Sequence, residues 1–133
     1  MNNILLFLLP KKDVEYVLDT FTVRQCLEKM DYHHYSAIPV LDKEGHYLKT
    51  ISDGDLLRTL RYWKFDNTII QKMRVGEILF VRSTQAINVA KTMDELVELI
   101  IQQNFVPVVD DRNFFIGIVT RKAVIEYLHR NQK

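Results

Sequence analysis

Two short stretches of the sequence carry the side chains best suited to chemistry. The first is Ser52-Asp53-Gly54-Asp55, and the second is Thr120-Arg121-Lys122. In each stretch a hydroxyl residue ends an apolar run and a helical pattern follows. The free N–H groups and the dipole of a helix N-terminus favour an anion such as phosphate. Carboxylates and basic side chains beside such a site make strong, charge-assisted hydrogen bonds to hydroxyls and phosphates.

The same side chains also have simpler explanations. Ser52 and Thr120 fit ordinary N-cap positions, and Asp55 fits a first-turn acid favoured by the helix dipole. Arg121 and Lys122 fit solvated surface charges equally well. A cap can also be a ligand, so the residues alone leave both interpretations open.

Both stretches belong to a unit that occurs twice in the chain. Pro39 and Pro107 lie 68 residues apart, as do Ser52 and Thr120. Each copy is predicted to run strand, helix, strand, strand, helix, because continuous apolar runs alternate with residues spaced i, i+3, i+4, i+7. The elements of the first copy are expected at 13–18, 22–33, 37–41, 47–52 and 54–63. Those of the second are expected at 86–89, 92–102, 106–109, 115–119 and 121–129.

The repeat predicts an α/β fold in which two β-α-β-β-α units pack sheet to sheet around a pseudo-two-fold axis, with the helices outside. Stacking would bury the apolar strands of both units. We expect an N-terminal segment at 1–12, a first domain at 13–68 and a second at 69–133. The polar stretch 64–74 is taken as the connection, followed by one helical turn at 75–79.

Composition excludes several classes of protein. The chain has 133 residues and a net charge of +1, which lacks the basic excess of a nucleic-acid-binding surface. The single cysteine, Cys26, cannot form an internal disulfide and is expected to be an inert core thiol. The apolar run Ile4–Leu9 is too short to span a membrane and is expected to dock on the core or on a partner. These features predict a cytoplasmic protein that binds no nucleic acid and no membrane.

No catalytic or metal-binding constellation is apparent. The adjacent His33 and His34 would point about 100° apart on a helix, so they cannot jointly hold one metal ion. The chain lacks a nucleophile elbow and a glycine-rich phosphate loop. We therefore expect no enzyme activity, no cofactor and no metal site.

The repeated motifs resemble a tandem pair of CBS domains, the Bateman module. Residues 37–40 (Ala-Ile-Pro-Val) and 105–108 (Phe-Val-Pro-Val) each precede a turn and a strand that ends in the hydroxyl residue. The resemblance covers about residues 13–128. It implies an adenine-nucleotide site in the cleft between the repeats, where the hydroxyl residue and an acid three positions on hold the ribose.

Carried to this chain, the resemblance implies unequal sites. Ser52, Asp55 and Thr120 would bind ribose, and Arg121 and Lys122 would bind phosphate. The implied base-pocket residues are Glu15, Tyr16, Val17, Tyr35, Ala37, Ile38, Ile87, Phe105 and Val106. The family's usual glycine before the hydroxyl is Lys49 in the first motif and Gly117 in the second. The usual acid of the second motif is replaced by Ala123.

The chain is also similar to short stand-alone bacterial CBS proteins that bind cyclic di-AMP, on the basis of Tyr35 and the run Thr120-Arg121-Lys122. A 3′,5′-linked dinucleotide has no free diol, so the cleft with Thr120 is expected to take a cyclic or phosphate-rich adenine nucleotide. The cleft with Ser52 and Asp55 would take AMP or stay empty.

The expected function is therefore a non-enzymatic sensor of AMP, ADP, ATP or cyclic di-AMP. It would signal to an effector protein and form a homodimer through its exposed helices. The alternative is an interaction or dimerisation module with vestigial clefts.

Overall fold

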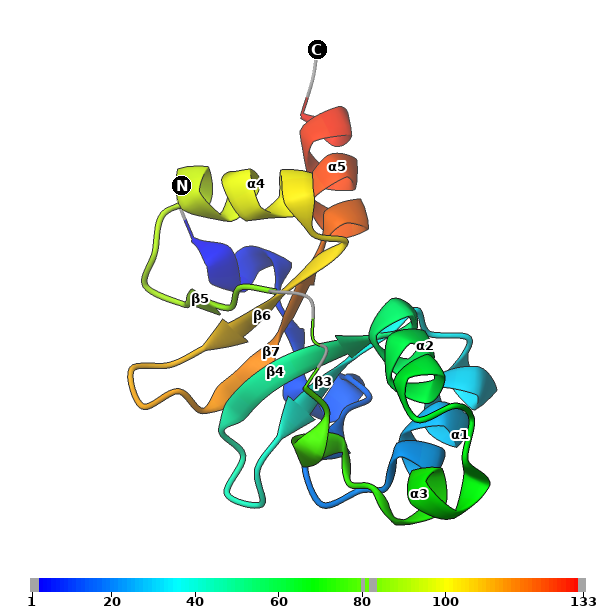
Figure 1. The fold of residues 1–133 in the computed structure, drawn as a ribbon. Coiled ribbons are helices and arrows are strands. Elements are labelled where there is room, and N and C mark those ends of the chain that lie inside the picture. The colour runs from blue at the N-terminus through cyan, green and yellow to red at the C-terminus, as the bar shows by residue number, and fades with distance from the viewer. Residues whose placement is uncertain (1–2, 80, 82–83, 132–133) are drawn as a thin grey trace. The chain divides into compact units, whose positions relative to one another are not determined.

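The computed structural model describes residues 3–79, 81 and 84–131. It divides into two compact units (Figure 1). The first-repeat unit is Glu15–Ser83, and the second-repeat unit joins Met1–Val14 to Thr84–Lys133. These boundaries differ from the expected division at 68/69, because the N-terminal segment packs with the second repeat and residues after 68 pack with the first.

The first-repeat unit is a three-stranded sheet with helices. Strand β2 (Val17–Leu18) runs parallel to β3 (Ala37–Leu41), which is antiparallel to β4 (Tyr47–Ser52). Helices α1 (Val23–His33) and α2 (Asp53–Tyr62) lie beside these strands in Figure 1, followed by α3 (Asn67–Lys72) and the 3-10 turn η3 (Val75–Glu77). One core joins the strands, both long helices and the segment after α3. Its fully buried members are Val17, Val23, Cys26, Ile38, Val40, Ile51 and Val75.

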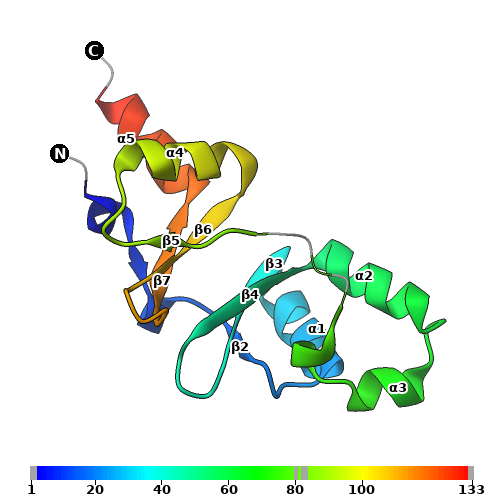
Figure 2. The same cartoon turned by 60° about the vertical axis from the view of Figure 1, so that its left-hand side comes forward.

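The second-repeat unit repeats this plan and adds one strand. Its sheet has the order β1 (Leu9–Pro10), β7 (Phe115–Thr120), β6 (Phe105–Val109) and β5 (Ile87–Asn88). Figure 2 shows α4 (Met93–Gln102) and α5 (Arg121–Arg130) lying together beside β6 and β7. The short 3-10 turns η1 (Ile4–Phe7) and η2 (Lys11–Asp13) flank β1.

The N-terminal segment docks on the core, as its apolar run predicts. The Ile4 side chain is fully buried in the core of the second-repeat unit, among Leu96, Val106, Val108 and others. Strand β1 pairs antiparallel with β7, Leu9 opposite Ile118 and Pro10 opposite Gly117.

The two central strands of each repeat, β3, β4, β6 and β7, and the four long helices are confirmed, with their caps. Thr22, Ser52 and Thr92 each accept a hydrogen bond from the backbone N–H three residues on, within a capping box. Gly45 has φ 100° in the turn between β3 and β4, the conformation that glycine allows most readily. Helix α1 ends at His34, whose φ of 58° lies in the left-handed region.

Three local expectations were wrong. The strand expected at 13–18 is reduced to Val17–Leu18, and Asp13 belongs to the 3-10 turn η2. The connection at 64–74 contains helix α3, capped by the Asp66 carboxylate, which accepts from the N–H groups of Thr68 and Ile69. The strand expected at 86–89 is only Ile87–Asn88. Within the described residues, the helices fall short of the length and apolar character that a membrane span requires.

Candidate functional site

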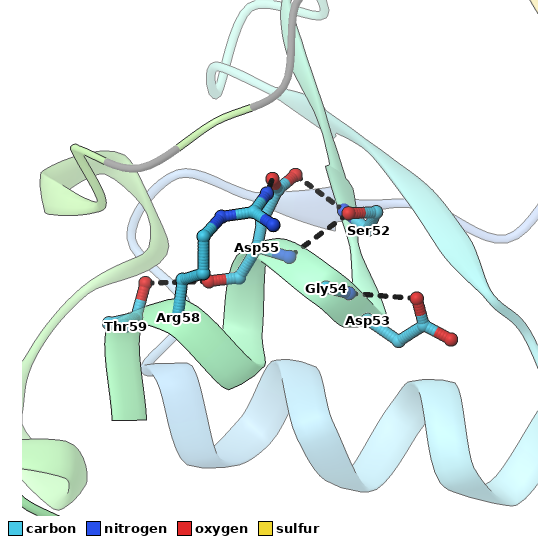
Figure 3. Close-up of polar contacts among 6 residues, drawn as sticks. All are labelled: Ser52, Asp53, Gly54, Asp55, Arg58 and Thr59. Atoms are coloured by element: carbon cyan, nitrogen blue, oxygen red, sulfur yellow. Dashed lines mark hydrogen bonds and ion pairs between the residues drawn. The ribbon is translucent and has the colours of Figure 1, made fainter. Parts of the chain in front are cut away.

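The first motif is a closed ring of hydrogen bonds at the junction of β4 and α2 (Figure 3). Ser52 Oγ accepts from the Asp55 N–H at 3.0 Å, and Asp55 Oδ2 accepts from the Ser52 N–H at 2.9 Å. This is a reciprocal capping box, and the Asp55 side chain is fully buried. The structure thus brings the hydroxyl and the carboxylate together, as the spacing predicts.

Arg58, one turn along α2, completes this arrangement. Its Nη2 donates to Asp55 Oδ1 at 2.6 Å, so both carboxylate oxygens of Asp55 accept hydrogen bonds. The Arg58 side chain remains 52% exposed while its partner is fully buried. The Thr59 hydroxyl donates to the Asp55 carbonyl at 2.9 Å, a second side-chain contact within the first turns of α2. The carboxylate predicted to bind ribose is therefore already paired within its own helix.

Lys49 occupies the position where the family usually has glycine. Its Nζ donates to the carbonyls of Gly76 at 3.4 Å and Ile78 at 3.2 Å. Burial lowers the pKa of Lys49, while the nearby charges of Asp19 and Asp55 act in the opposite direction. The side chain thus ties the segment after α3 to β4 and adds positive charge near Asp55.

Gly117, the matching residue of the second repeat, leaves room for protein backbone. A Cβ atom at this position would collide with the carbonyl oxygen of Leu9 and approach Leu8 Cδ1 to 2.8 Å. The φ of Gly117 is 156°, which side-chain-bearing residues rarely adopt. In this unit the glycine is required by the close approach of β1.

The second motif is a simple cap. Thr120 Oγ1 accepts from the Ala123 N–H at 3.1 Å, and Ala123 offers no carboxylate to return the bond. Arg121 Nε donates to the Ile100 carbonyl at 2.8 Å, at the end of α4 where the helix dipole favours a cation. The Arg121 guanidinium, predicted to bind phosphate, is thus engaged by α4, whereas Lys122 is exposed.

The expected base-pocket residues fall into two groups. Several side chains lie in the two hydrophobic cores: Val17, Ile38, Ile87 and Val106. The others are partly or largely accessible: Glu15, Tyr16, Tyr35, Ala37 and Phe105. Ala37 pairs with Ser52 across the sheet and Phe105 pairs with Thr120, so each lies beside the motif of its own repeat.

Glu15 and Tyr35 belong to a second polar cluster of the first-repeat unit. The Glu15 carboxylate lies 3.2 Å from Lys29 Nζ and 3.5 Å from His33 Nε2. The His33 and Tyr35 rings are stacked, with centroids 5.3 Å apart. Partial burial and the Glu15 charge raise the pKa of Tyr35. The cluster offers an aromatic face beside a carboxylate, which suits a nitrogenous base.

Sequence reasoning missed Arg58, Lys29 and the pairing of His33. The signal for Arg58 was present, because residues three apart on a helix are neighbours and an acid followed by a base at that spacing forms an ion pair. The contacts of Lys29 and His33 with Glu15 join α1 to the loop before β2, which spacing alone does not reveal.

One further cluster of potential metal ligands lies in the turn after β3. Donor atoms of Asp42, Glu44 and His46 all lie within 4.8 Å of one another. The Asp42 carboxylate accepts hydrogen bonds from the backbone N–H groups of Glu44 and His46, at 3.0 and 2.9 Å. His46 Nδ1 lies 2.9 Å from the same carboxylate. These contacts form a side-chain-stabilised turn.

Comparison with known proteins shows the family of the chain. The family model described as "CBS domain" matches residues 8–62 and 75–130, once for each repeat. The chain belongs to the CBS domain family. The two matches explain why the hydroxyl motifs recur at one spacing, and they confirm the tandem arrangement inferred from sequence.

Solved structures of CBS proteins resemble the chain over almost its full length. A structure of CbpB in complex with c-di-AMP is 26% identical, covers 96% of this chain and 85% of its own, and has a TM-score of 0.88. A hypothetical conserved protein from Geobacillus kaustophilus is 26% identical, with coverage of 99% and 100% and a TM-score of 0.88. A structure of CBSX2 in complex with AMP is 22% identical, covers 100% of both chains at a TM-score of 0.80, and supports the fold. No curated protein sequence matches the chain.

Proposed function

We propose that this CBS protein is a non-enzymatic regulatory module that binds adenine nucleotides. The observation that carries the proposal is the Ser52–Asp55 ring, in which a hydroxyl and a buried carboxylate are held at the N-terminus of α2. A carboxylate accepts two charge-assisted hydrogen bonds from a ribose diol, and the helix N-terminus favours the phosphate. The likeness to CbpB, whose structure contains c-di-AMP, supports this class of ligand.

The two motifs are proposed to differ in ligand. Ser52 and Asp55 suit a mononucleotide with a free diol, such as AMP. Thr120 lacks a neighbouring acid, since Ala123 takes that place, and suits a cyclic dinucleotide such as cyclic di-AMP. Lys122 is exposed and offers the second motif a positive charge. That a ligand bridges both repeats stays a prediction.

The proposal is tested by a thermal-shift series with AMP, ADP, ATP, cyclic di-AMP and S-adenosylmethionine. A ligand at about 100 times its Kd should stabilise the protein by roughly 2.7 kcal/mol, a rise of several degrees in Tm for a chain of this size. The variant Asp55→Asn keeps an acceptor for the Ser52 N–H and should lose the AMP response while retaining that of cyclic di-AMP. A flat response to all five compounds would refute the proposal.

A specific observation favours the alternative of an interaction module with vestigial clefts. The groups that would bind a nucleotide are already paired within their own units, Asp55 with Arg58 and Arg121 with the Ile100 carbonyl. In a vestigial cleft such pairs would be permanent. The ligand series above separates the two functions, because only the nucleotide sensor responds.

We further propose self-association as a homodimer through the helices. A groove of about 540 Å³ runs between α1 and α2, with Leu27, Met30 and Leu57 among its apolar lining residues. Leu57 is 52% exposed. The acids at this groove, Asp31 and Asp53, complement the basic end of α5 of a second copy.

Sedimentation of Leu57→Glu tests this contact. The variant should be monomeric at concentrations where the unmodified protein is dimeric. Leu79→Glu is a matched control, since Leu79 is 85% exposed and lies outside the groove. Monomers for the unmodified protein would refute the homodimer. Signalling to an effector protein would then use the free helix face, and pull-down with and without nucleotide would test it.

A further inference from the structure

The Asp55–Arg58 pair has an uneven exposure that points to an exchange on ligand binding. Asp55 Oδ2 is held by the Ser52 N–H, and this bond is half of the capping box that starts α2. Asp55 Oδ1 is held by Arg58 Nη2 at 2.6 Å. The carboxylate is fully buried, while the arginine side chain is 52% exposed.

A ribose diol carries two O–H donors and needs the carboxylate as acceptor. The Ser52 N–H cannot leave Asp55 without opening the first turn of α2, whereas the Arg58 guanidinium can rotate into solvent. A carboxylate has about four lone-pair positions, and of these two partners only Arg58 contributes a side chain, which reaches solvent. A diol that reaches Asp55 therefore takes the place of Arg58.

The displaced guanidinium stays tethered one helical turn from Asp55. It is planar and always charged, and it matches a phosphate group with two parallel N–H donors. Lys49 adds a second positive charge in the field of Asp55. The surroundings of the first motif thus favour a ligand that brings both a diol and an anion.

We propose that Arg58 is a specificity-determining residue that passes from Asp55 to the ligand phosphate when the ribose binds. This inference rests on the proposed function of the first motif. It assigns that motif to ribonucleoside phosphates with a free diol. Adenosine breaks the Asp55–Arg58 pair and supplies no new partner for the guanidinium, so the motif discriminates against it. A cyclic dinucleotide has no free diol and does not trigger the exchange.

The test is calorimetric titration of AMP and of adenosine into the intact protein and its variants. The unmodified protein should bind AMP at least roughly tenfold more tightly than adenosine, the value of one charge-assisted bond to phosphate. Arg58→Gln should weaken the binding of AMP by roughly tenfold, because the phosphate loses its partner. It should tighten the binding of adenosine about two- to fivefold, because a partly exposed ion pair with Arg58 no longer competes with the diol for Asp55. The preference for AMP is then lost. Arg58→Lys keeps the charge without the fork and should fall between the two.

Arg61→Gln is the matched control, because Arg61 is exposed on the same helix and its removal changes the net charge equally. It should leave the AMP-to-adenosine ratio unchanged. Thermal unfolding of each variant checks that the fold is intact, and the side-chain Nε–Hε signal of Arg58 in NMR should shift with AMP.

The outcomes separate the inference from the proposed function. If AMP binds, Asp55→Asn weakens it, and Arg58→Gln leaves the ratio unchanged, the inference is wrong and the nucleotide site stands. If Arg61→Gln lowers the ratio as much as Arg58→Gln, the effect is one of overall charge and the exchange is refuted. If neither ligand binds the unmodified protein, both the proposed function and the exchange fall.

Discussion

Replacing Gly117 by alanine should detach the N-terminal strand from the second-repeat unit. The added Cβ would collide with the Leu9 carbonyl, which is backbone and cannot rotate aside, and would approach Leu8 Cδ1 to 2.8 Å. Overpacking of this kind costs about 1–3 kcal/mol, and a strained φ adds about 1–3 kcal/mol. The sum is roughly 2–6 kcal/mol if nothing moves.

The destabilisation should be smaller than this sum at its upper end, because the chain can relieve the clash by releasing β1 from β7. Release of β1 from β7 exposes Ile4, whose burial contributes about 1.5–3 kcal/mol, and opens ladder hydrogen bonds worth about 0.5–1.5 kcal/mol each. We therefore expect a destabilisation of about 2–4 kcal/mol, set by the cheaper of the two responses.

Urea unfolding of a double-mutant cycle tests this reasoning. If Gly117→Ala already frees the segment, adding Ile4→Ala should lower the free energy of unfolding by little more, a strong departure from additivity. Gly54→Ala is the matched control: its Cβ would meet only Arg58 Nη1 at 3.5 Å and Ser52 Oγ at 3.7 Å. Inside α2 alanine should stabilise by about 0.4–1 kcal/mol. A Gly117→Ala variant within about 0.5 kcal/mol of the unmodified protein, or full additivity with Ile4→Ala, would refute the clash.

Three further predictions concern single side chains. Hydrogen bonds donated by the backbone N–H and the hydroxyl of Thr92 hold the pKa of Glu95 below its usual range. The stability that Glu95 contributes is therefore present at pH values above its pKa in the unfolded chain. It is lost as the pH falls through its pKa in the folded protein. Glu95→Gln should flatten the acid limb of the stability profile below about pH 4, and an unchanged limb would contradict the cap. Burial raises the pKa of Cys26 to about 11, so about one thiol in a thousand is ionised at pH 8. Labelling of Cys26 by a disulfide reagent should therefore require unfolding of the protein. Rapid labelling of the folded protein would show that the thiol is accessible. Lys49→Met removes the hydrogen bonds to the Gly76 and Ile78 carbonyls and should lower the free energy of unfolding by roughly 1 kcal/mol. Backbone amides near η3 should exchange hydrogen faster in the variant. Equal exchange rates in both proteins would mean that Lys49 does not hold this segment.

Some of the fold could be read from the chain because it depends on local pattern. The apolar runs of β3 and β6 and the capping residues Thr22, Ser52 and Thr92 determine their elements through nearest neighbours. Helix α3 escaped prediction because its six residues are too few to show helical periodicity.

The candidate site divides in the same way. The reciprocal bonds of Ser52 and Asp55 follow from a spacing of three at a helix start, which a sequence displays directly. The hydrogen bond of Arg121 does not follow from spacing, because its partner carbonyl belongs to α4, twenty-one residues away. Only the packing of α4 near the start of α5 brings the guanidinium and this carbonyl together.

The sequence by itself determined that this is a doubled CBS unit with two unequal hydroxyl motifs, since repetition and spacing are properties of the chain. The tertiary structure alone decided which charged groups find partners in distant parts of the chain: Glu15 with Lys29, Lys49 with the carbonyls after α3, and Arg121 with the end of α4. The physical reason is that burial and partner choice depend on every element that packs around a side chain. A charged group takes whichever partner the fold brings near and desolvates with it.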